Sequence, residues 1–460
     1  MTVEQIAALG PAFTSYLGCF RSCFVTRNTF AHLNTYCRGL LSDLPRKSVE
    51  PIALAGGCAV RTLQEFLTHH TWDQTRMRDQ MQRRVVREHL PPPGAARPAG
   101  GGGVGVVGWI DETSVAKKGD KTPGVQRQYC GASGKIDNCI VTVHLACRCG
   151  MFSAMLDSDL FLPQDSWDQD RDRCKAAHVP DHVIYTSKWL LALDQVKRAM
   201  ANGVRFDWLT FDEWYGGKPD FLDGIEDLGQ LYVCEAPANL PCFPKLPKYN
   251  SLQRPFASQR VDTAGKFSKP FKGKPWTRVK LARKTLGDQV WEVRAAQVYL
   301  SRDGKPTDRT YWLIVARSVK TGAVKYFVSN APSKTALTTL MKVAFTRWGV
   351  EHVFRLAKTE IGFGHFEGRS YQGLMRHMVL CQLVLLFAAE QTDRLRGEKP
   401  GGDDRADGAG AQRVVPVLAR APLDAVAGRE RRIDDPVSPA EKSGRQIIQA
   451  ARFAQAGVAL

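Results

Sequence analysis

Three acidic side chains stand at places in the chain from which a fold can bring them together. Asp111 follows the apolar run Val104–Ile110, Asp212 follows Arg205–Phe211, and Glu351 lies in a stretch with helical spacing. Cleavage of a phosphodiester with Mg²⁺ or Mn²⁺ needs hard oxygen ligands around two ions that lie roughly 3.5–4 Å apart. We therefore expect Asp111, Asp212 and Glu351 to be the catalytic residues and to hold two Mg²⁺ or Mn²⁺ ions.

The segments around the first two acids predict an α/β core, a mixed five-stranded sheet flanked by helices. In chain order they are the strands Val104–Ile110, Ile136–Cys147 and Gly150–Leu162, the helix Lys188–Asn202, the strand Arg205–Phe211, a short helix at Pro219–Leu228 and the strand Leu231–Glu235. In this order the first and fourth strands lie side by side, so Asp111 and Asp212 are expected at one edge of the sheet, each closing its strand. Glu112 and Glu213 are adjacent acids, but neighbours on a strand point to opposite faces.

The third acid belongs to a helix that we expect over residues Ser333–Glu360. Arg347, Glu351, Arg355 and Lys358 recur there at offsets of four and seven, which places them on one helical face. A carboxylate among these cations stays ionised near neutrality, as a metal ligand must. The alternative is an ordinary ladder of i,i+4 ion pairs on an exposed helix.

The charge of the chain indicates a polyanionic partner, nucleic acid before an anionic membrane. The formal net charge is +18 over 460 residues, and such an excess favours nucleic acid. Residues 241–320 hold 18 Lys and Arg against 5 Asp and Glu, a balance of +13. The chain contains no run of 18 apolar residues and no signal-like start, so we expect an intracellular protein without a membrane span.

Several basic side chains are candidates for contacts with DNA. Lys117, Lys118 and Arg127 follow the first acid, where they either hold phosphates near the metals or are simply solvated. The insertion contributes the further candidates Lys272, Lys274, Trp276, Arg278 and Lys280. Trp276, an aromatic among cations, either stacks on an unpaired base or packs in a core, and the core is the more common outcome.

Composition and periodicity divide the chain into six segments. They are a helical N-terminal DNA-binding domain at 1–92, a linker at 93–103, the first part of the core at 104–235, a basic β-rich insertion at 236–332, the C-terminal helices of the core at 333–392 and a largely disordered tail at 393–460. In the first segment, Thr71–Gln74 predicts a helix start, with Met77, Met81 and Val85 on one stripe. The arginines on the other faces of that helix are either solvated or in contact with DNA.

Taken in order, the acidic blocks resemble a known family. Ile110-Asp111-Glu112-Thr113, Phe211-Asp212-Glu213-Trp214-Tyr215-Gly216 and Arg347-x3-Glu351-x6-Lys358 are similar to the three blocks of DDE transposases from bacterial insertion sequences. The resemblance is to the branch with a β-rich insertion and a Tyr-Arg-Glu-Lys motif, and it covers roughly residues 15–390. Further similar blocks are Lys117-Lys118-Gly119, Arg127–Gly131, Asp137-Asn138, Val328-Ser329-Asn330, Tyr36-x2-Gly39-Leu40-Leu41, Arg46-Lys47 and Trp72-Asp73.

The resemblance implies an RNase H-like catalytic core and a mechanism. Water attacks at the transposon end and frees a 3′-hydroxyl, which then attacks target DNA. The partners implied are double-stranded DNA, as terminal inverted repeats and target, and a second copy of the chain in a dimer on DNA. Cytoplasmic localisation, with the nucleoid, is implied as well. One position departs from the motif, because Ala344 stands where the family has Tyr, with Phe345 beside it. That departure leaves open an impaired enzyme.

Two alternatives stay open at this stage. One is another RNase H-like nuclease, although the 139 positions from Asp212 to Glu351 (351 − 212) exceed the short spacing usual there. The other is a catalytically impaired or domesticated protein that only binds DNA.

Overall fold

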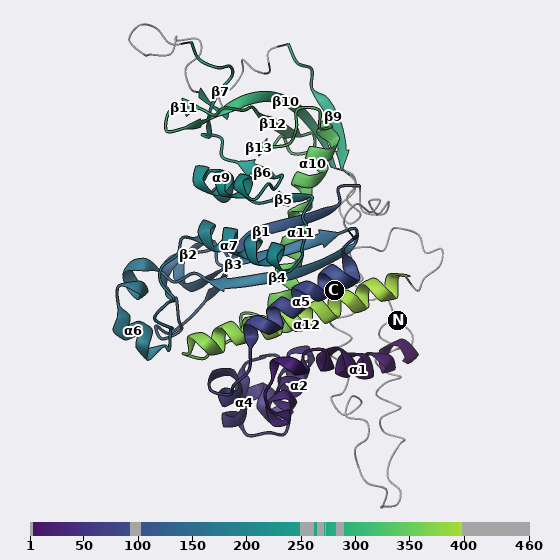
Figure 1. Cartoon of the computed structure of the whole chain (residues 1–460), viewed down its shortest axis with the longest axis vertical. Coiled ribbons are helices and arrows are strands. Elements are labelled where there is room, and N and C mark those ends of the chain that lie inside the picture. Colours follow the sequence, from purple (N-terminus) through teal and green to yellow (C-terminus); the bar gives the residue numbers. More distant parts are fainter. Residues whose placement is uncertain are drawn as a thin grey trace, which may run out of the picture.

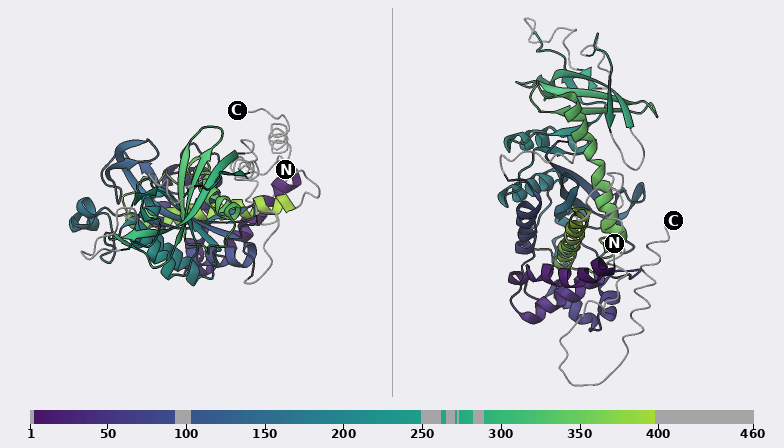
Figure 2. Two further views of the ribbon diagram at one scale, coloured as in Figure 1. Left: turned by 90° about the horizontal axis from the view of Figure 1, so that it is seen from above. Right: turned by 90° about the vertical axis from the view of Figure 1, so that its right-hand side faces the viewer.

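The computed structural model describes residues 3–92, 103–248, 262–264, 271, 273–281 and 289–397. Three layers follow one another along its long axis: the N-terminal helices, a central sheet with helices packed on it, and a second, β-rich sheet at the far end (Figure 1). The two turned views keep this order (Figure 2). The segments 93–103 and 393–460, predicted as linker and tail, lie almost entirely outside the described residues.

The central sheet has five strands, which are β1 (Val106–Ala116), β2 (Gln126–Cys130), β3 (Lys135–Cys149), β4 (Phe152–Leu160) and β5 (Trp208–Thr210). β1 pairs antiparallel with β3 and parallel with β5, and β3 pairs antiparallel with β2 and β4. The predicted adjacency of the strand before Asp212 and the strand of Asp111 is therefore confirmed. The mixed sheet flanked by helices agrees with the expected α/β class.

Three details of that prediction are wrong. β1 does not end before Asp111, because its ladder with β3 continues to Ala116; backbone pairing carries a strand past the point where its apolar run stops. β2 was not predicted. The strand expected at 231–235 is β6 (Val233–Ala236), which belongs to the second sheet and meets the first beside β5, where a bridge joins Leu209 and Tyr232.

The two faces of the central sheet carry different helices. The helices around it are α7 (Lys188–Ala201), α10 (Leu337–Thr346), α11 (Trp348–Leu356) and α12 (Tyr371–Gly397). Asp111 is paired with His144, whose ring lies 5.0 Å from that of Phe354 in α11. Glu112 points to the other face, where it forms an ion pair of 2.9 Å with Lys188 of α7. The predicted opposition of Asp111 and Glu112 is thus observed.

The second sheet has eight strands within the described residues. They are β6, β7 (Pro241–Phe243), β8 (Asp262–Thr263), β9 (Thr277–Leu281), β10 (Gln289–Arg302), β11 (Lys305–Pro306), β12 (Tyr311–Ser318) and β13 (Val324–Ser329). In the sequence, Val290–Tyr299, Thr310–Ala316 and Lys325–Ser329 have the pattern of strands, and the three longest strands of the sheet, β10, β12 and β13, match them. The other four strands of the insertion are short and were not predicted.

Five helices precede the sheet and share its hydrophobic core. They are α1 (Val3–Gly18), α2 (Arg27–Leu41), α3 (Val49–Ala55), α4 (Val60–Thr68) and α5 (Gln74–His89). The start predicted for α5 within Thr71–Gln74 is confirmed, although the cap is Asp73, whose side chain accepts the backbone N–H of Arg76. The predicted stripe of Met77, Met81 and Val85 is buried. Two α5 arginines face inward: Arg84 pairs with Glu390 at 2.6 Å and Arg78 lies 3.8 Å from Asp157.

Among the described residues, one helix is long and apolar enough to cross a membrane by length and composition. It is the stretch Tyr371–Leu395 of α12, and 83% of its most apolar window is buried inside the protein. Figure 1 shows α12 running beside α5 beneath the central sheet. A helix that is apolar on nearly all sides suits such a core position.

His89 at the end of α5 should make stability depend on pH. Burial lowers its pKa, but Asp393 and Glu390, at 3.5 and 3.6 Å, outweigh this and raise the pKa to about 9. Because the folded pKa exceeds the unfolded value, the stabilisation is fully present below about pH 6.5 and is lost as pH rises through about 9. His89→Phe, which keeps a ring on Phe152, should lower the free energy of unfolding by about 1–2 kcal/mol at pH 6 and by little at pH 10.

Urea denaturation at the two pH values measures this difference. The same change at His69, an exposed residue at the end of α4, is the control and should show no such dependence. An equal loss at pH 6 and pH 10 would contradict the ion-pair explanation.

Candidate active site

Asp111 is a buried carboxylate held by an arginine. Its Oδ2 accepts a hydrogen bond from Arg347 Nη1 at 3.1 Å, and both side chains are 14% exposed. Burial raises the pKa of Asp111 to about 7, Arg347 opposes this, and the negative charge of Asp212 adds to it. The interaction with Asp212 places the two carboxylates near one another.

Asp212 is positioned by the short helix α8 (Glu213–Gly216), which it caps. Its Oδ1 accepts the backbone N–H groups of Trp214 at 3.0 Å and of Tyr215 at 3.2 Å. An aspartate at this position satisfies N–H groups that a helix start leaves without partners. Because β5 leads into Asp212 and runs parallel to β1, both carboxylates lie at the same edge of the sheet.

Arg347 lies between two helices, where the sequence predicted a single one, and its own backbone stays helical (φ −52°, ψ −37°). α10 ends at Thr346 and α11 begins at Trp348. Two contacts with β1 hold the junction in place. Trp109 Nε1 donates to Thr346 Oγ1 at 3.1 Å, and Gly349 packs so tightly that a Cβ there would lie 2.5 Å from the Trp109 ring. The sheet therefore decides where the arginine points.

Glu351 does not join the first two acids in this structure. Its side chain is exposed on α11, and no group of three or more His, Cys, Asp or Glu within the described ranges could hold a metal ion. The four side chains of the predicted common face differ in burial, because Arg347 and Lys358 are half-buried whereas Glu351 and Arg355 are exposed. The π-helical turn Ala357–Ile361 changes the register before Lys358. Among the described residues no ion pair joins Glu351 to Arg347 or Arg355 either, so the ladder alternative is not seen.

Lys358 lies on the same side of the sheet as Asp111. Burial lowers the pKa of this lysine, whereas Cys130 and Asp111 raise it. Its charge in turn contributes, after burial, to lowering the pKa of His144 to about 3. Lys358 is therefore half-buried close to Asp111, while Arg355 is exposed and contacts His352 at 3.0 Å.

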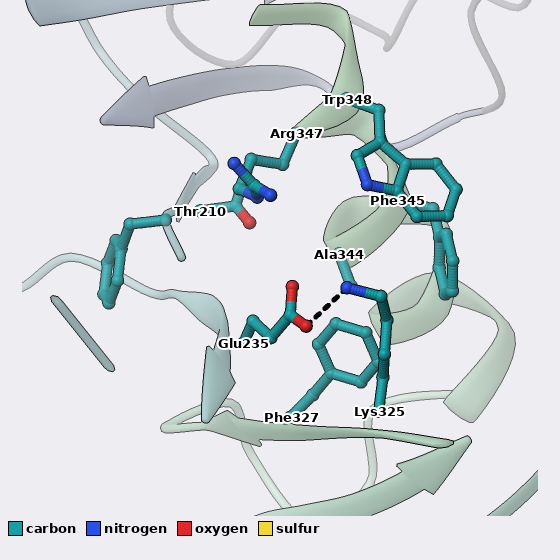
Figure 3. Close-up of a pocket in the computed structure, with 9 residues that line it drawn as sticks. Thr210, Glu235, Lys325, Phe327, Ala344, Phe345, Arg347 and Trp348 are labelled. Carbon is teal, nitrogen blue, oxygen red and sulfur yellow. Dashed lines mark hydrogen bonds and ion pairs between the residues drawn. The ribbon is translucent and has the colours of Figure 1, made fainter. Parts of the chain in front are cut away.

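A small pocket adjoins Arg347 between β5, β6, β13 and the α10–α11 junction. Figure 3 shows the guanidinium of Arg347 and the ion pair of Glu235 with Lys325 around it. The residues lining it are Thr210, Phe211, Glu235, Lys325, Phe327, Ala344, Phe345, Arg347 and Trp348. Ala344, where the resembling motif has Tyr, is one of them, so a larger side chain there would enter the pocket.

The carboxylate oxygens of Asp111 and Asp212 at the sheet edge have the chemistry that a hard divalent cation requires. Asp111 and Asp212 offer oxygen only, which Mg²⁺ and Mn²⁺ prefer. Burial disfavours the negative charge of two nearby carboxylates, and the pKa of Asp111 is raised for this reason. These two residues fit such an ion, and Glu351 in its present position does not contribute.

Comparison with known proteins decides the family. The family model described as DDE superfamily endonuclease matches residues 19–295, more than half of the chain. This chain belongs to the DDE superfamily endonucleases. The match includes Asp111 and Asp212 and ends before Glu351. Membership implies an RNase H-like fold, with which the mixed central sheet and its helices agree.

One curated relative is a probable transposase for insertion sequence element IS701 from Microchaete diplosiphon. It is 29% identical over 228 residues, which is 49% of this chain and 53% of the relative. The chain thus matches about half the length of that relative.

The basic residues that follow Asp111 in this DDE superfamily endonuclease differ in how accessible they are to DNA. Lys117 Nζ donates to the backbone oxygens of Gly364, at 3.4 Å, and Phe366. Through these hydrogen bonds Lys117 holds the segment that follows the π-helical turn. Burial also lowers its pKa to about 8. Lys118 and Arg127 are exposed, the latter on the edge strand β2.

In the insertion, two arginines that were not among the predicted residues lie over Trp276. This side chain is half-buried and therefore not the core residue that we expected. The guanidinium carbons of Arg294 and Arg317 lie 4.4 and 4.8 Å from its ring centroid. Glu292 pairs with Arg317 at 2.6 Å and with Arg278 at 3.5 Å, which forms a row across three strands.

Of the other predicted DNA-binding residues in the insertion, Lys274 and Lys280 belong to the described part of the chain. Lys274 is exposed, and its Nζ donates to the oxygen of Ala295 at 3.1 Å. Lys280 is exposed on β9. Lys272 lies outside the described residues.

Two residues beside Asp212 were not among the predicted site residues. Trp214 is 40% exposed, with Lys218 Nζ at 5.0 Å and Lys188 Nζ at 5.3 Å from its ring. Tyr215 is fully buried. The sequence offered one signal for them, their place directly after the acid, whereas burial and ring contacts depend on the folded chain.

Proposed function

We propose that this protein is a transposase that binds the ends of its insertion sequence, cleaves DNA there and joins the freed 3′-hydroxyl ends to target DNA. The observation that carries the proposal is the pairing of β1 with β5, which sets Asp111 and Asp212 at one edge with Arg347 on Asp111. Membership of the DDE superfamily endonucleases supports phosphodiester cleavage. The name of the IS701 relative supports transposition.

Asp111 and Asp212 would hold the metal, and Glu351 would be the third ligand. Two divalent cations bound there would activate the attacking oxygen and neutralise charge on the leaving oxygen. Arg347 orients the Asp111 carboxylate through its hydrogen bond and brings a positive charge to the place where a phosphate would lie. Glu351 is exposed on the helix that packs on β1, so its carboxylate is accessible to an incoming cation or to DNA.

The DNA would reach this edge across basic side chains from several elements. Lys358 lies near Asp111, Lys118 and Arg127 are exposed on the neighbouring loop and strand, and Arg355 is exposed on α11. The insertion would hold further backbone phosphates. We propose double-stranded DNA as partner, as terminal inverted repeats and target, and a dimer of the chain on DNA in the cytoplasm.

The test is metal-dependent nicking of DNA that carries the inverted repeats flanking the gene. Cleavage at the repeat end with Mg²⁺ or Mn²⁺, followed by joining to a second duplex, is the expected result. Binding of the repeat without nicking would favour a catalytically impaired protein, an outcome that Ala344 and the exposed Glu351 make worth testing. Nicking of branched DNA in preference to the repeat would favour another RNase H-like nuclease.

The insertion should supply much of the salt-dependent DNA affinity. Each phosphate that a Lys or Arg neutralises releases condensed counterions, which contributes about −0.9 to the slope of log affinity against log salt. Replacing four cations of the insertion with Gln should make the slope shallower by up to about 4 units, equally on specific and unrelated DNA. The four residues are Lys272, Lys274, Arg278 and Lys280.

A matched set of four exposed arginines on the N-terminal helices is the control, measured by the same salt titration. They are Arg27, Arg61, Arg76 and Arg83. If this set changes the slope and the insertion set does not, the N-terminal helices hold the DNA instead.

A further inference from the structure

Tyr215 carries a buried hydroxyl on the short helix that Asp212 caps. The side chain is fully buried directly after the α8 cap. Its hydroxyl makes no hydrogen bond within the described part of the chain. Burial raises the pKa of Tyr215; among the neighbouring charges Glu112 raises it most, followed by Asp212 and Asp111.

The surroundings keep the ring in this place. Its own backbone N–H is bound by Asp212 Oδ1 at 3.2 Å. Trp214 and Phe221 pack on the ring at centroid distances of 4.9 and 5.3 Å. At the next residue, Gly216, α8 approaches β6 so closely that any Cβ would clash with the backbone oxygen of Glu235. These contacts hold the Tyr215 ring beside the Asp212 cap and leave little room for α8 to move.

A hydroxyl in this position is unfavourable for the fold taken alone. Burying a donor without a partner carries the full cost of its desolvation. Phenylalanine would fill the same space without that cost. The phenol can donate a hydrogen bond, and the nearby carboxylates and any water bound to them can accept one.

We propose that Tyr215 is a positioning residue of the carboxylate site, whose hydroxyl donates a hydrogen bond to a water in the hydration shell of a divalent cation held by Asp111 and Asp212. This inference rests on the proposed function. Groups that hold the outer shell of a metal site fix the orientation of its ligands, and their loss typically weakens metal affinity or activity by about 10- to 100-fold.

The experiment compares Tyr215→Phe with the wild-type full-length protein, free of DNA, in two measurements. Calorimetric titration with Mn²⁺ should show affinity weaker by about 10- to 100-fold. Thermal unfolding without metal should show a Tm equal to or above that of the wild type, because the orphan hydroxyl is removed. Nicking, where measured, should need more Mg²⁺ and recover at high Mg²⁺.

Tyr232→Phe is the matched control. Tyr232 is also fully buried, but its hydroxyl donates to Glu226 Oε1 at 3.0 Å. Its loss should lower the metal-free Tm and leave Mn²⁺ affinity unchanged, the opposite of the pattern for Tyr215. The pair therefore separates a metal-site role from a structural one.

Three results would overturn the inference. Wild-type Mn²⁺ affinity in Tyr215→Phe would make the hydroxyl an unpaired core atom and leave the proposed function standing. A lower metal-free Tm in that variant would show that the hydroxyl has a partner in the fold. If the wild type binds no Mn²⁺, or if Asp111→Asn removes none of the Mn²⁺ binding, the proposed metal site is overturned. This inference then falls with it.

Discussion

Asp111→Asn should reduce metal-dependent strand cleavage by about 10³-fold or more while leaving DNA affinity nearly unchanged. A metal ion contributes several kcal/mol of transition-state stabilisation, and each 1.36 kcal/mol corresponds to tenfold in rate. Asparagine keeps the size of the side chain but removes the charge that holds the ion. Asp111 is 14% exposed and bonded to Arg347, so it contributes little surface to DNA binding.

The variant should also be at least as stable as the wild type without metal, which excludes unfolding as the cause. The folded pKa of Asp111, about 7, lies above its unfolded value, so the ionised group destabilises the fold increasingly as pH rises from about 4 through 7. Asparagine removes that penalty, and the metal-free Tm at pH 8 should be equal or higher. Thermal unfolding and nicking of end-labelled DNA measure the two effects.

Asp120→Asn is the matched control for the chemical change. This aspartate is exposed and lies 3.8 Å from Lys121, and its loss should not affect cleavage. Asp212→Asn and Glu351→Gln should behave like Asp111→Asn. The Glu351 variant is the most informative of the three, because the carboxylate is exposed here. Cleavage near the wild-type rate would remove the altered residue from the site.

Gly349→Ala should reduce cleavage by about 10²-fold, an effect transmitted through packing. The new Cβ would lie 2.5 Å from the Trp109 ring, so α11 must shift away from β1 and take Arg347 and Glu351 with it. A displacement of about 1 Å at catalytic groups costs roughly 10²-fold in rate. Overpacking should also lower the free energy of unfolding by about 1–3 kcal/mol. Nicking rates and urea denaturation measure the two losses.

Trp109→Phe provides the decisive comparison for this prediction. The smaller ring of phenylalanine leaves space for the new methyl group. The double variant Gly349→Ala/Trp109→Phe should therefore recover part of the lost rate, although each single variant is impaired. Gly18→Ala in α1, where a Cβ meets nothing within 4 Å, is the control and should leave cleavage unchanged. Additive losses in the double variant would contradict the packing explanation.

Local pattern was sufficient to locate much of the core in the sequence. Apolar runs placed the strands of Asp111 and Asp212, and their order implied that the two strands pair, which β1 and β5 confirm. Helical spacing and the capping pattern at Thr71–Gln74 placed the start of α5, which is capped by Asp73. These features depend on neighbours a few residues apart, and such short-range rules act before any tertiary contact forms. The charge of the insertion was equally readable, because charge needs only composition.

Tertiary contacts decided where the side chains around the acids go. Spacing put Arg347 and Glu351 on one helical face, but in the fold Arg347 bonds Asp111 whereas Glu351 stays exposed. Lys117 donates to a backbone oxygen some 250 positions away, and Tyr215 is fully buried directly after the α8 cap. Each outcome depends on groups distant in sequence that compete for one side chain. Periodicity specifies the face of an element but not the partner that the fold brings to it.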